Sequence, residues 1–122
     1  MGKPDSLLPL KATVFQILLS LLDGERHGYV LMQEIADRTG GKLRILPGAM
    51  YRFLQRMLED GLIRESYQRG ANVPPHEQRR SYAITKFGRR VAEAEATRLN
   101  QLVEYSKSKN LLKDVSLEQR SP

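Results

Sequence analysis

The chain has 122 residues, 40% of them hydrophobic and 28% charged, and its 20 Lys and Arg against 14 Asp and Glu give a formal net charge of +6. This length and composition predict one small folded domain. The chain has no cysteine, which excludes disulfides, thiolate zinc sites and cysteine nucleophiles, and with only two histidines a metal site would need mostly carboxylates.

The excess positive charge lies in the middle of the chain. Residues 47–90 hold nine Lys and Arg and four Asp and Glu, a net charge of +5, whereas residues 1–46 have +1 and residues 91–122 have zero. This asymmetry favours a polyanionic partner, nucleic acid before an anionic membrane, although a solvated basic face gives the same pattern. No apolar run is long enough for a membrane helix and no secretory signal is evident, so we expect a cytoplasmic protein with no membrane partner.

The first helix is expected over residues 9–22, because proline suits a first helical position and Gly24 suits a helix stop. Two apolar stripes at helical spacing predict burial on more than one side. One side can pack within its own domain, and the other is available to a second chain. The apolar positions are Leu10, Val14, Phe15, Ile17, Leu18, Leu19, Leu21 and Leu22.

A second helix is expected from about residue 27 to residue 38, ending before Gly40 and Gly41. At its start we expect Gly28 to permit close helix approach and Tyr29 to pack inward. The third helix is expected over residues 47–60, with Gly61 as its stop. Its residues divide into two faces at helical spacing: Met50, Leu54, Met57 and Leu58 form an apolar core face, and Tyr51, Arg52, Gln55 and Arg56 form a polar, basic outer face.

Residues 62–68 and 80–85 alternate in polarity, and the ten residues 69–78 between them are rich in turn formers, which predicts a β-hairpin with a long tip. Thr85 then suits the N-cap of a last helix that reaches Lys107 or beyond. A helix of residues 86–107 would be roughly 33 Å long, more than the preceding chain can cover, so we expect it to project and to pair with something. Residues 113–122 are expected to form a flexible tail.

The order helix, helix, helix, hairpin, long helix is that of a winged helix-turn-helix, a mainly α fold with a small β-hairpin. We expect residues 8–84 to bind DNA and residues 85–112 to form a dimerisation helix. An exposed arginine can pair with guanine and a glutamine with adenine in the major groove, while hairpin cations can reach phosphate. The plain alternative for these side chains is a solvated surface.

Several short motifs together resemble the PadR family of bacterial transcriptional regulators, over about residues 8–105. They are His27-Gly28-Tyr29, Gly40-Gly41, Pro47-Gly48-Ala49-Met50-Tyr51-Arg52, Leu54, Leu58-Glu59, Gly61-Leu62-Ile63 and the run from Arg79 to Arg89. The short tail resembles the compact subfamily, which has a single C-terminal helix. The resemblance implies a homodimeric repressor on a palindromic operator, often released by a small-molecule effector.

Ala49 stands where many relatives carry Thr or Ser, so one side-chain phosphate contact is missing, although backbone N–H groups remain. Drug-binding relatives stack ligands on a tryptophan, which this chain lacks. The predicted DNA contacts are Pro47, Gly48, Tyr51, Arg52, Gln55, Arg56, Arg69, Arg79, Arg80 and Lys86. The predicted dimer contacts are Leu10, Val14, Phe15, Leu18, Leu22, Val91, Leu99, Leu102 and Val103. The alternative for the four residues of the last helix is that they belong to the core of the single chain.

Two other functions compete with this interpretation. A winged-helix module could use the same basic face to bind an acidic protein, and salt dependence and sequence preference of DNA binding would distinguish the two. An enzyme is disfavoured, because the sequence has no phosphate loop, no nucleophile with a partnered base and no metal-ligand spacing. No cofactor is expected.

Overall fold

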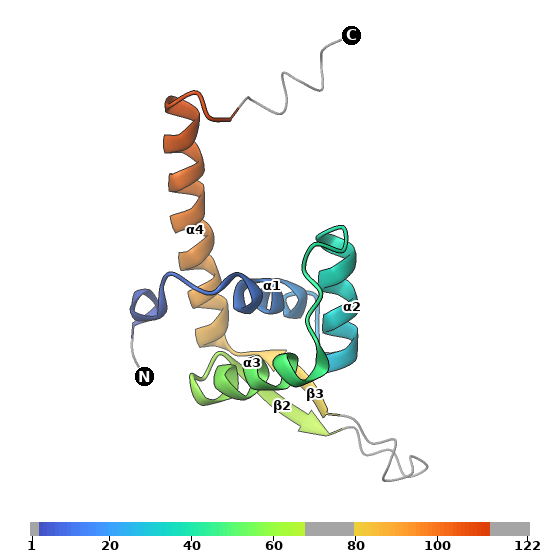
Figure 1. Ribbon diagram of the computed structural model, residues 1–122. Coiled ribbons are helices and arrows are strands. Elements are labelled where there is room, and N and C mark those ends of the chain that lie inside the picture. Colours follow the sequence, from blue (N-terminus) through green and yellow to red (C-terminus); the bar gives the residue numbers. More distant parts are fainter. Residues whose placement is uncertain (1–2, 68–79, 113–122) are drawn as a thin grey trace.

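The computed structural model describes residues 3–67 and 80–112. Its elements, in chain order, are η1 (Pro4–Leu7), α1 (Ala12–Leu21), β1 (Arg26–His27), α2 (Gly28–Arg38), α3 (Pro47–Glu59), β2 (Ile63–Tyr67), β3 (Arg80–Ile84) and α4 (Lys86–Ser108). Helices α1, α2 and α3 pack together beside a small antiparallel sheet, and α4 rises away from them (Figure 1). The predicted fold class, a mainly α winged helix-turn-helix with a small β element, is confirmed.

The sheet has three strands rather than the predicted two. Its order is β1-β3-β2, and β3 pairs antiparallel with both neighbours, with Ser81 opposite His27 on one side and Ser66 on the other. Because β3 is central, Ser81, Tyr82 and Ala83 are all buried, and the expected alternation of inward and outward residues fails there. The strand β1 was missed because two residues carry no periodic signal and pair only with a distant segment.

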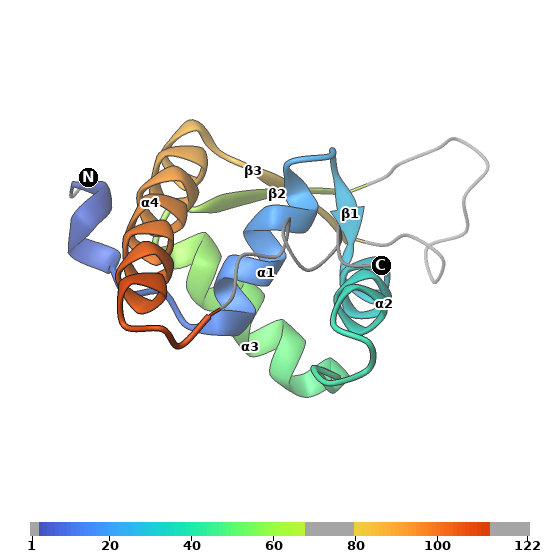
Figure 2. The same cartoon turned by 90° about the horizontal axis from the view of Figure 1, so that it is seen from above.

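Helix α1 begins three residues later than predicted. Lys11, its N-cap, has an extended backbone, and the N–H of Leu10 donates to the side chain of Glu95 on α4 at 2.9 Å. Residues 9–11 therefore belong to an N-terminal arm, residues 3–11, that packs against α4, which lies beside η1 in both views (Figures 1 and 2). Pro9 tolerates this extended segment as readily as it would have tolerated a helix start.

The hydrophobic core joins all the described helices and the sheet, and two predicted dimer residues belong to it. Leu18 and Val91 are both 0% exposed within the single chain, so they have no surface to offer a partner. Their apolar stripes were correctly recognised, but their own domain covers them. Tyr29 shows the opposite error: it is 56% exposed instead of packed inward, and Leu31 and Ile35 supply the buried face of α2.

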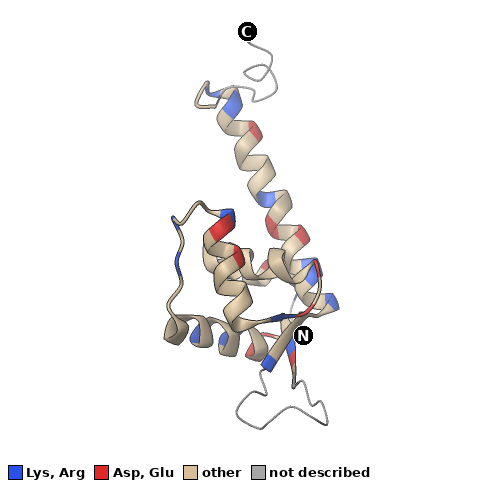
Figure 3. Cartoon of the chain, turned by 90° about the vertical axis from the view of Figure 1, so that its right-hand side faces the viewer, with Lys and Arg blue, Asp and Glu red and all other residues tan. Residues whose placement is uncertain are grey.

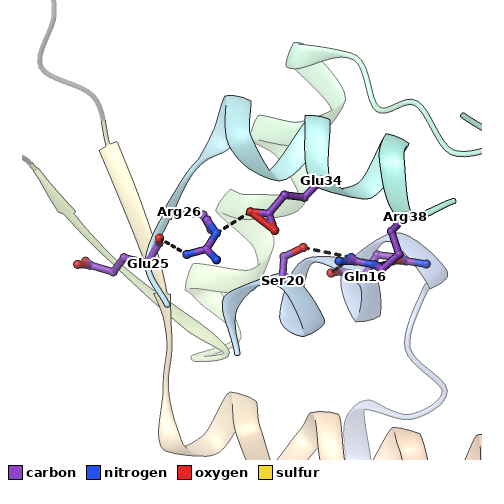
Figure 4. Close-up of polar contacts among 6 residues, drawn as sticks. All are labelled: Gln16, Ser20, Glu25, Arg26, Glu34 and Arg38. Atoms are coloured by element: carbon purple, nitrogen blue, oxygen red, sulfur yellow. Dashed lines mark hydrogen bonds and ion pairs between the residues drawn. The ribbon is translucent and has the colours of Figure 1, made fainter. Parts of the chain in front are cut away.

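Polar contacts fix α2 against the rest of the domain (Figure 4). Arg38 near its end donates to the Gln16 side chain at 2.8 Å, to the Gln16 carbonyl at 2.9 Å and to the Ser20 hydroxyl at 3.1 Å, all on α1. Arg26 of β1 pairs with Glu34 of α2. The bonds from Arg38 join α2 to α1, and the Arg26–Glu34 pair joins α2 to β1.

Helix α4 has two distinct halves. Its first turns bury Phe87, Val91 and Ala92 in the core, whereas Leu102 and Val103 beyond them are exposed. The expected projection of the last helix is therefore present (Figure 1). The exposed Leu102 and Val103 follow the buried Val91 and Ala92 at helical spacing, so the apolar face continues along the projecting half. Along the described parts of the chain, no helix combines the length and apolar character needed to cross a membrane.

The ends of α3 and α4 meet in a compact joint. Gly61, with φ of +75°, closes α3, and the Leu62 N–H donates to the Met57 carbonyl, as in a Schellman motif. Thr85 caps α4 as predicted: its hydroxyl accepts from the Gly88 N–H at 2.9 Å and donates to the Gly61 carbonyl at 2.7 Å. We call this contact of residues 61–62 with residues 85–88 the α3–α4 joint.

Glycine is required at position 88 because α4 lies directly on the backbone of Leu62. A Cβ built on Gly88 would stand 2.0 Å from the Leu62 carbonyl oxygen, an impossible contact with backbone that cannot simply swing away. We expect Gly88→Ala to lower the free energy of unfolding by about 1–3 kcal/mol or more, as overpacked sites do. Urea denaturation followed by circular dichroism, at one fixed protein concentration, measures this change.

Gly48→Ala is the matched control, because Gly48 is helical and its Cβ would meet no atom closer than 3.8 Å. We expect it to leave stability unchanged or to raise it by about 0.4–1 kcal/mol. Equal effects at the two positions would contradict the proposed role of the α3–α4 joint.

The arm is anchored by a buried carboxylate. Glu95 is 2% exposed, forms an ion pair with Arg98 and accepts the Leu10 N–H. The hydrogen bond from Arg98, supported by the one from Leu10, outweighs burial and holds the pKa of Glu95 below its ordinary value of 4.5. A carboxyl group with a lowered folded-state pKa stabilises the fold above its unfolded pKa, and that contribution is lost as the pH falls through the folded-state pKa.

We therefore expect Glu95→Gln to lower the free energy of unfolding by about 1–3 kcal/mol at pH 7, and by progressively less as the pH falls below 4.5. The control is Glu104→Gln, which removes an exposed carboxylate paired with Lys107 on the same helix and should change stability by under about 0.5 kcal/mol. Urea titrations at a series of pH values test both. A Glu95→Gln effect that stays constant down to the most acidic pH would refute the anchor.

Candidate nucleic-acid interface

The start of α3 presents backbone donors. Pro47 is its first residue, Leu46 is an extended N-cap, and no side chain caps this end. The first helical hydrogen bond runs from the Met50 N–H to the Leu46 carbonyl, so the amides of Gly48 and Ala49 precede it. Such amides, at the positive end of the helix dipole, suit a phosphate oxygen, and glycine lets the phosphate approach closely.

The two predicted faces of α3 are both present. Met50, Leu54 and Met57 are each 1% exposed and pack in the core, and Leu58 is half-buried beside them. On the opposite side Tyr51 is 61% exposed. Arg52, Gln55 and Arg56 are also exposed, and Arg56 carries an ion pair to Asp60 at 3.4 Å. We call Tyr51, Arg52, Gln55 and Arg56 the outer face of α3.

The outer face combines chemistry for two kinds of contact with DNA. Arginine and glutamine carry donors that match guanine and adenine edges, and the tyrosine hydroxyl can bond phosphate while its ring packs on sugar. The basic residues of α3 are both arginines, and they are coloured blue on the horizontal helix low in Figure 3. Among the residues that the structure describes, no cluster of acidic and histidine side chains could hold a metal.

The strands add basic residues beside this helix. Arg80 begins β3 and pairs with Glu65 of β2 at 3.8 Å, while Lys86 is exposed at the first position of α4. Arg69 and Arg79, the other predicted contacts, lie outside the described residues, as do the hairpin tip and the tail. Within β3, burial above all raises the pKa of the Tyr82 hydroxyl above its ordinary value of 10.0.

Two exposed residues were missed by the sequence analysis. Tyr29 stands at the start of α2, and its hydroxyl accepts a hydrogen bond from Gln33 at 2.9 Å. Arg64 is exposed on β2, directly after the buried Ile63. The alternation along β2 could have revealed Arg64, whereas Tyr29 occupied an apolar stripe that periodicity alone assigned to the core.

The predicted dimer residues divide by exposure. Leu22, Leu102 and Val103 are exposed, which is the condition for contacting a second chain. Four more are half-buried: Leu10, Val14, Phe15 and Leu99. Leu18 and Val91 are core residues, as described above, and are therefore removed from the predicted dimer contacts.

Comparison with known proteins agrees with this geometry. The model of the transcriptional regulator PadR-like family matches residues 17–94. A Lysinibacillus sphaericus protein described as uncharacterized protein X is 32% identical over 73 residues, which are 60% of this chain and 64% of that protein. The matched part thus spans less than two thirds of that relative.

Solved structures share the fold. A transcriptional regulator from Clostridium thermocellum superimposes with a TM-score of 0.67 at 20% identity, covering 79% of this chain and 87% of that one. Bacillus subtilis PadR, solved in complex with operator DNA, superimposes with a TM-score of 0.60 at 19% identity over 70% of this chain and 47% of that one. The family model covers more than half of the sequence, and the chain therefore belongs to the PadR-like family of transcriptional regulators.

Proposed function

We propose that this transcriptional regulator binds DNA sequence-specifically as a homodimer, represses transcription from a palindromic operator and is released by a small-molecule effector. The observation that carries the proposal is the exposed outer face of α3, polar and basic, on a helix whose opposite face is sealed in the core. Membership of the family and the operator complex of the Bacillus subtilis relative support DNA as the partner.

In this proposal, α3 lies in the major groove. Arg52, Gln55 and Arg56 contact base edges or phosphate, and Tyr51 contacts the backbone. The amide of Gly48, after Pro47, donates to a phosphate at the helix start. Arg80 and Lys86 reach flanking phosphates, together with Arg69 and Arg79 of the hairpin.

Dimerisation is proposed to use the projecting half of α4. Leu99, Leu102 and Val103 share one face of the helix, and the last two are 52% and 40% exposed. An apolar stripe on a helix that leaves its own domain requires a cover, and a second copy supplies an identical stripe. We therefore assign DNA binding to residues 8–84 and dimerisation to residues 85–112, with Leu10, Val14, Phe15 and Leu22 of the first helix region beside them.

Selection from random duplex DNA at moderate salt is the decisive experiment. We expect enrichment of a palindrome whose half-sites lie about one helical turn apart, as two symmetric recognition helices require. Weak retention that depends strongly on salt and shows no sequence preference would instead favour the alternative, a module that binds an acidic protein. Repression is tested by a reporter under the selected site, with the regulator present and absent.

Within the outer face, Arg52→Gln should weaken binding to the selected site about tenfold and leave the oligomeric state unchanged, because Arg52 faces away from the core. The salt dependence identifies the contact. Loss of a phosphate contact lowers the slope of log K against log salt by about 0.9, whereas loss of a base contact relaxes sequence preference at one position. Fluorescence anisotropy over a salt series measures both.

Lys109→Gln is the matched control, because it removes one positive charge at the far end of α4. We expect it to leave the affinity for the selected site unchanged.

We expect Tyr51→Ala to weaken DNA binding as Arg52→Gln does. Tyr51→Phe removes the hydroxyl alone and so distinguishes its contribution to DNA affinity from that of the ring. A Tyr51→Ala protein that keeps its oligomeric state and its full affinity for the site would remove Tyr51 from the interface.

The dimer proposal is tested by Leu102→Lys, which places a charge in the exposed stripe without disturbing the core of the single chain. We expect this variant to sediment as a monomer at concentrations where the parent is a dimer, and to bind the full palindrome at least tenfold more weakly. Gln101→Lys adds the same charge one residue earlier, on the opposite side of α4, and should change neither property. A Leu102→Lys dimer would rule out the projecting stripe.

A further inference from the structure

A cavity of about 580 Å³ lies beside the recognition helix, between the proposed dimer contacts Leu10 and Val14 and the proposed DNA contacts Arg52 and Arg56. Leu7 and Leu10 of the N-terminal arm and Val14 of α1 form one wall. Phe53 and Met57 of α3, with Leu62 after it, form the other. Its volume falls in the range of roughly 300–1,000 Å³ typical of small-molecule sites, and its lining combines eight apolar residues with four charged ones.

The mouth of this cavity is positively charged. Lys11, Arg52 and Arg56 line it, against a single carboxylate, Asp60. Asp60 forms an ion pair with Arg56, with its carboxylate 3.4 Å from the guanidinium Nε, and a guanidinium has five N–H donors in all. An apolar interior with three cations at its opening is complementary to a molecule that has a hydrophobic body and an anionic end.

The positions of the cations connect the cavity to the outer face of α3. Around α3, Arg52 and Arg56 lie on the side of the outer face next to Ala49 and Phe53 of the cavity wall, whereas Tyr51 and Gln55 lie on the side away from the cavity. The same two arginines therefore border both surfaces. Because Ala49 has only a methyl group, it leaves this edge of the cavity open.

We propose that the cavity binds a small amphipathic anion, with an aromatic or aliphatic body and one carboxylate or sulfonate, and that this ligand competes with DNA for Arg52 and Arg56. The proposal rests on the proposed function, because it identifies the class of effector and its site. The ligand body packs between the N-terminal arm and α3, and its anionic group takes the place of a DNA phosphate at the two guanidinium groups.

The opposite wall of the cavity is fixed to α4. The Leu10 N–H donates to the Glu95 carboxylate at 2.9 Å, which holds the arm in place while its neighbouring side chains line the cavity. A ligand in this position contacts the arm, anchored to the proposed dimerisation helix, and α3, which carries the proposed DNA contacts. The site is therefore placed to influence both the charge and the position of the recognition helix.

The test uses 8-anilinonaphthalene-1-sulfonate, a fluorescent amphipathic anion, with the full chain. We expect a saturable increase in fluorescence at one site per protomer. N-phenyl-1-naphthylamine, which has the same rings without the sulfonate, should bind at least tenfold more weakly. Saturating sulfonate probe should also lower the affinity for the selected DNA severalfold.

Three variants locate the probe. Arg52→Gln should weaken sulfonate binding about fivefold or more, and Ala49→Phe, which fills the open edge of the cavity, should abolish it. Lys109→Gln, which removes a positive charge far from the cavity, should leave it unchanged. Circular dichroism and sedimentation check that each variant keeps its fold and its oligomeric state.

The proposal is overturned if N-phenyl-1-naphthylamine binds as tightly as the sulfonate probe. It is also overturned if the sulfonate probe still binds with unchanged affinity to both the Arg52→Gln and the Ala49→Phe variants. A change of oligomeric state in Ala49→Phe overturns it as well, because it would mean that a second copy fills the cavity. The two hypotheses fail separately: a selected palindrome without probe binding removes only the effector site, whereas probe binding without DNA selection removes the DNA function and leaves the cavity as a ligand site.

Discussion

The close contact between Gly88 and the Leu62 carbonyl is the constraint on which the arrangement of this molecule depends. Leu62 follows directly on the end of α3, and Gly88 lies in the first turn of α4. Since no Cβ fits between them, the two helices meet at backbone contact distance, and the Thr85 hydroxyl bonds to both sides of the junction. Helix α3 carries the proposed DNA contacts and α4 the proposed dimer stripe, so the α3–α4 joint sets how one is placed relative to the other.

Glu95 holds α4 from a different direction. The α3–α4 joint fixes the first turn of α4, and two turns further on the buried carboxylate binds the arm through Leu10. A long helix that is held at two points keeps its orientation relative to the rest of the domain, whereas a helix held at a single point could change its orientation. For a symmetric dimer this rigidity matters, because the separation of two recognition helices must match the spacing of two half-sites on DNA.

The elements predicted correctly from the sequence are those whose signals are local. The Thr85 cap, the Gly61 stop and the two faces of α3 each depend on residues within a few positions of one another. Apart from Tyr29, the errors named above involve distant partners. Helix α1 starts late because Glu95, 85 residues away from Leu10, binds its backbone, and β1 exists because β3 lies beside it. Leu18 and Val91 show the same limit, since an apolar stripe does not reveal which chain covers it.

The same limit of sequence-based prediction applies to the candidate site on the outer face of α3. A period of 3.6 residues separates Arg52 and Arg56 from the core, but it cannot reveal that the N-terminal arm lies nearby and forms a cavity with the helix. With the arm in place, the two arginines differ from Gln55 on the same face, because only they border the cavity. Two cations that can each contact either of two anionic partners cannot fully satisfy both at once. Competition between DNA and an anionic ligand therefore needs no large conformational change. A rotation of the arginine side chains, from the DNA-facing surface toward the cavity, is sufficient.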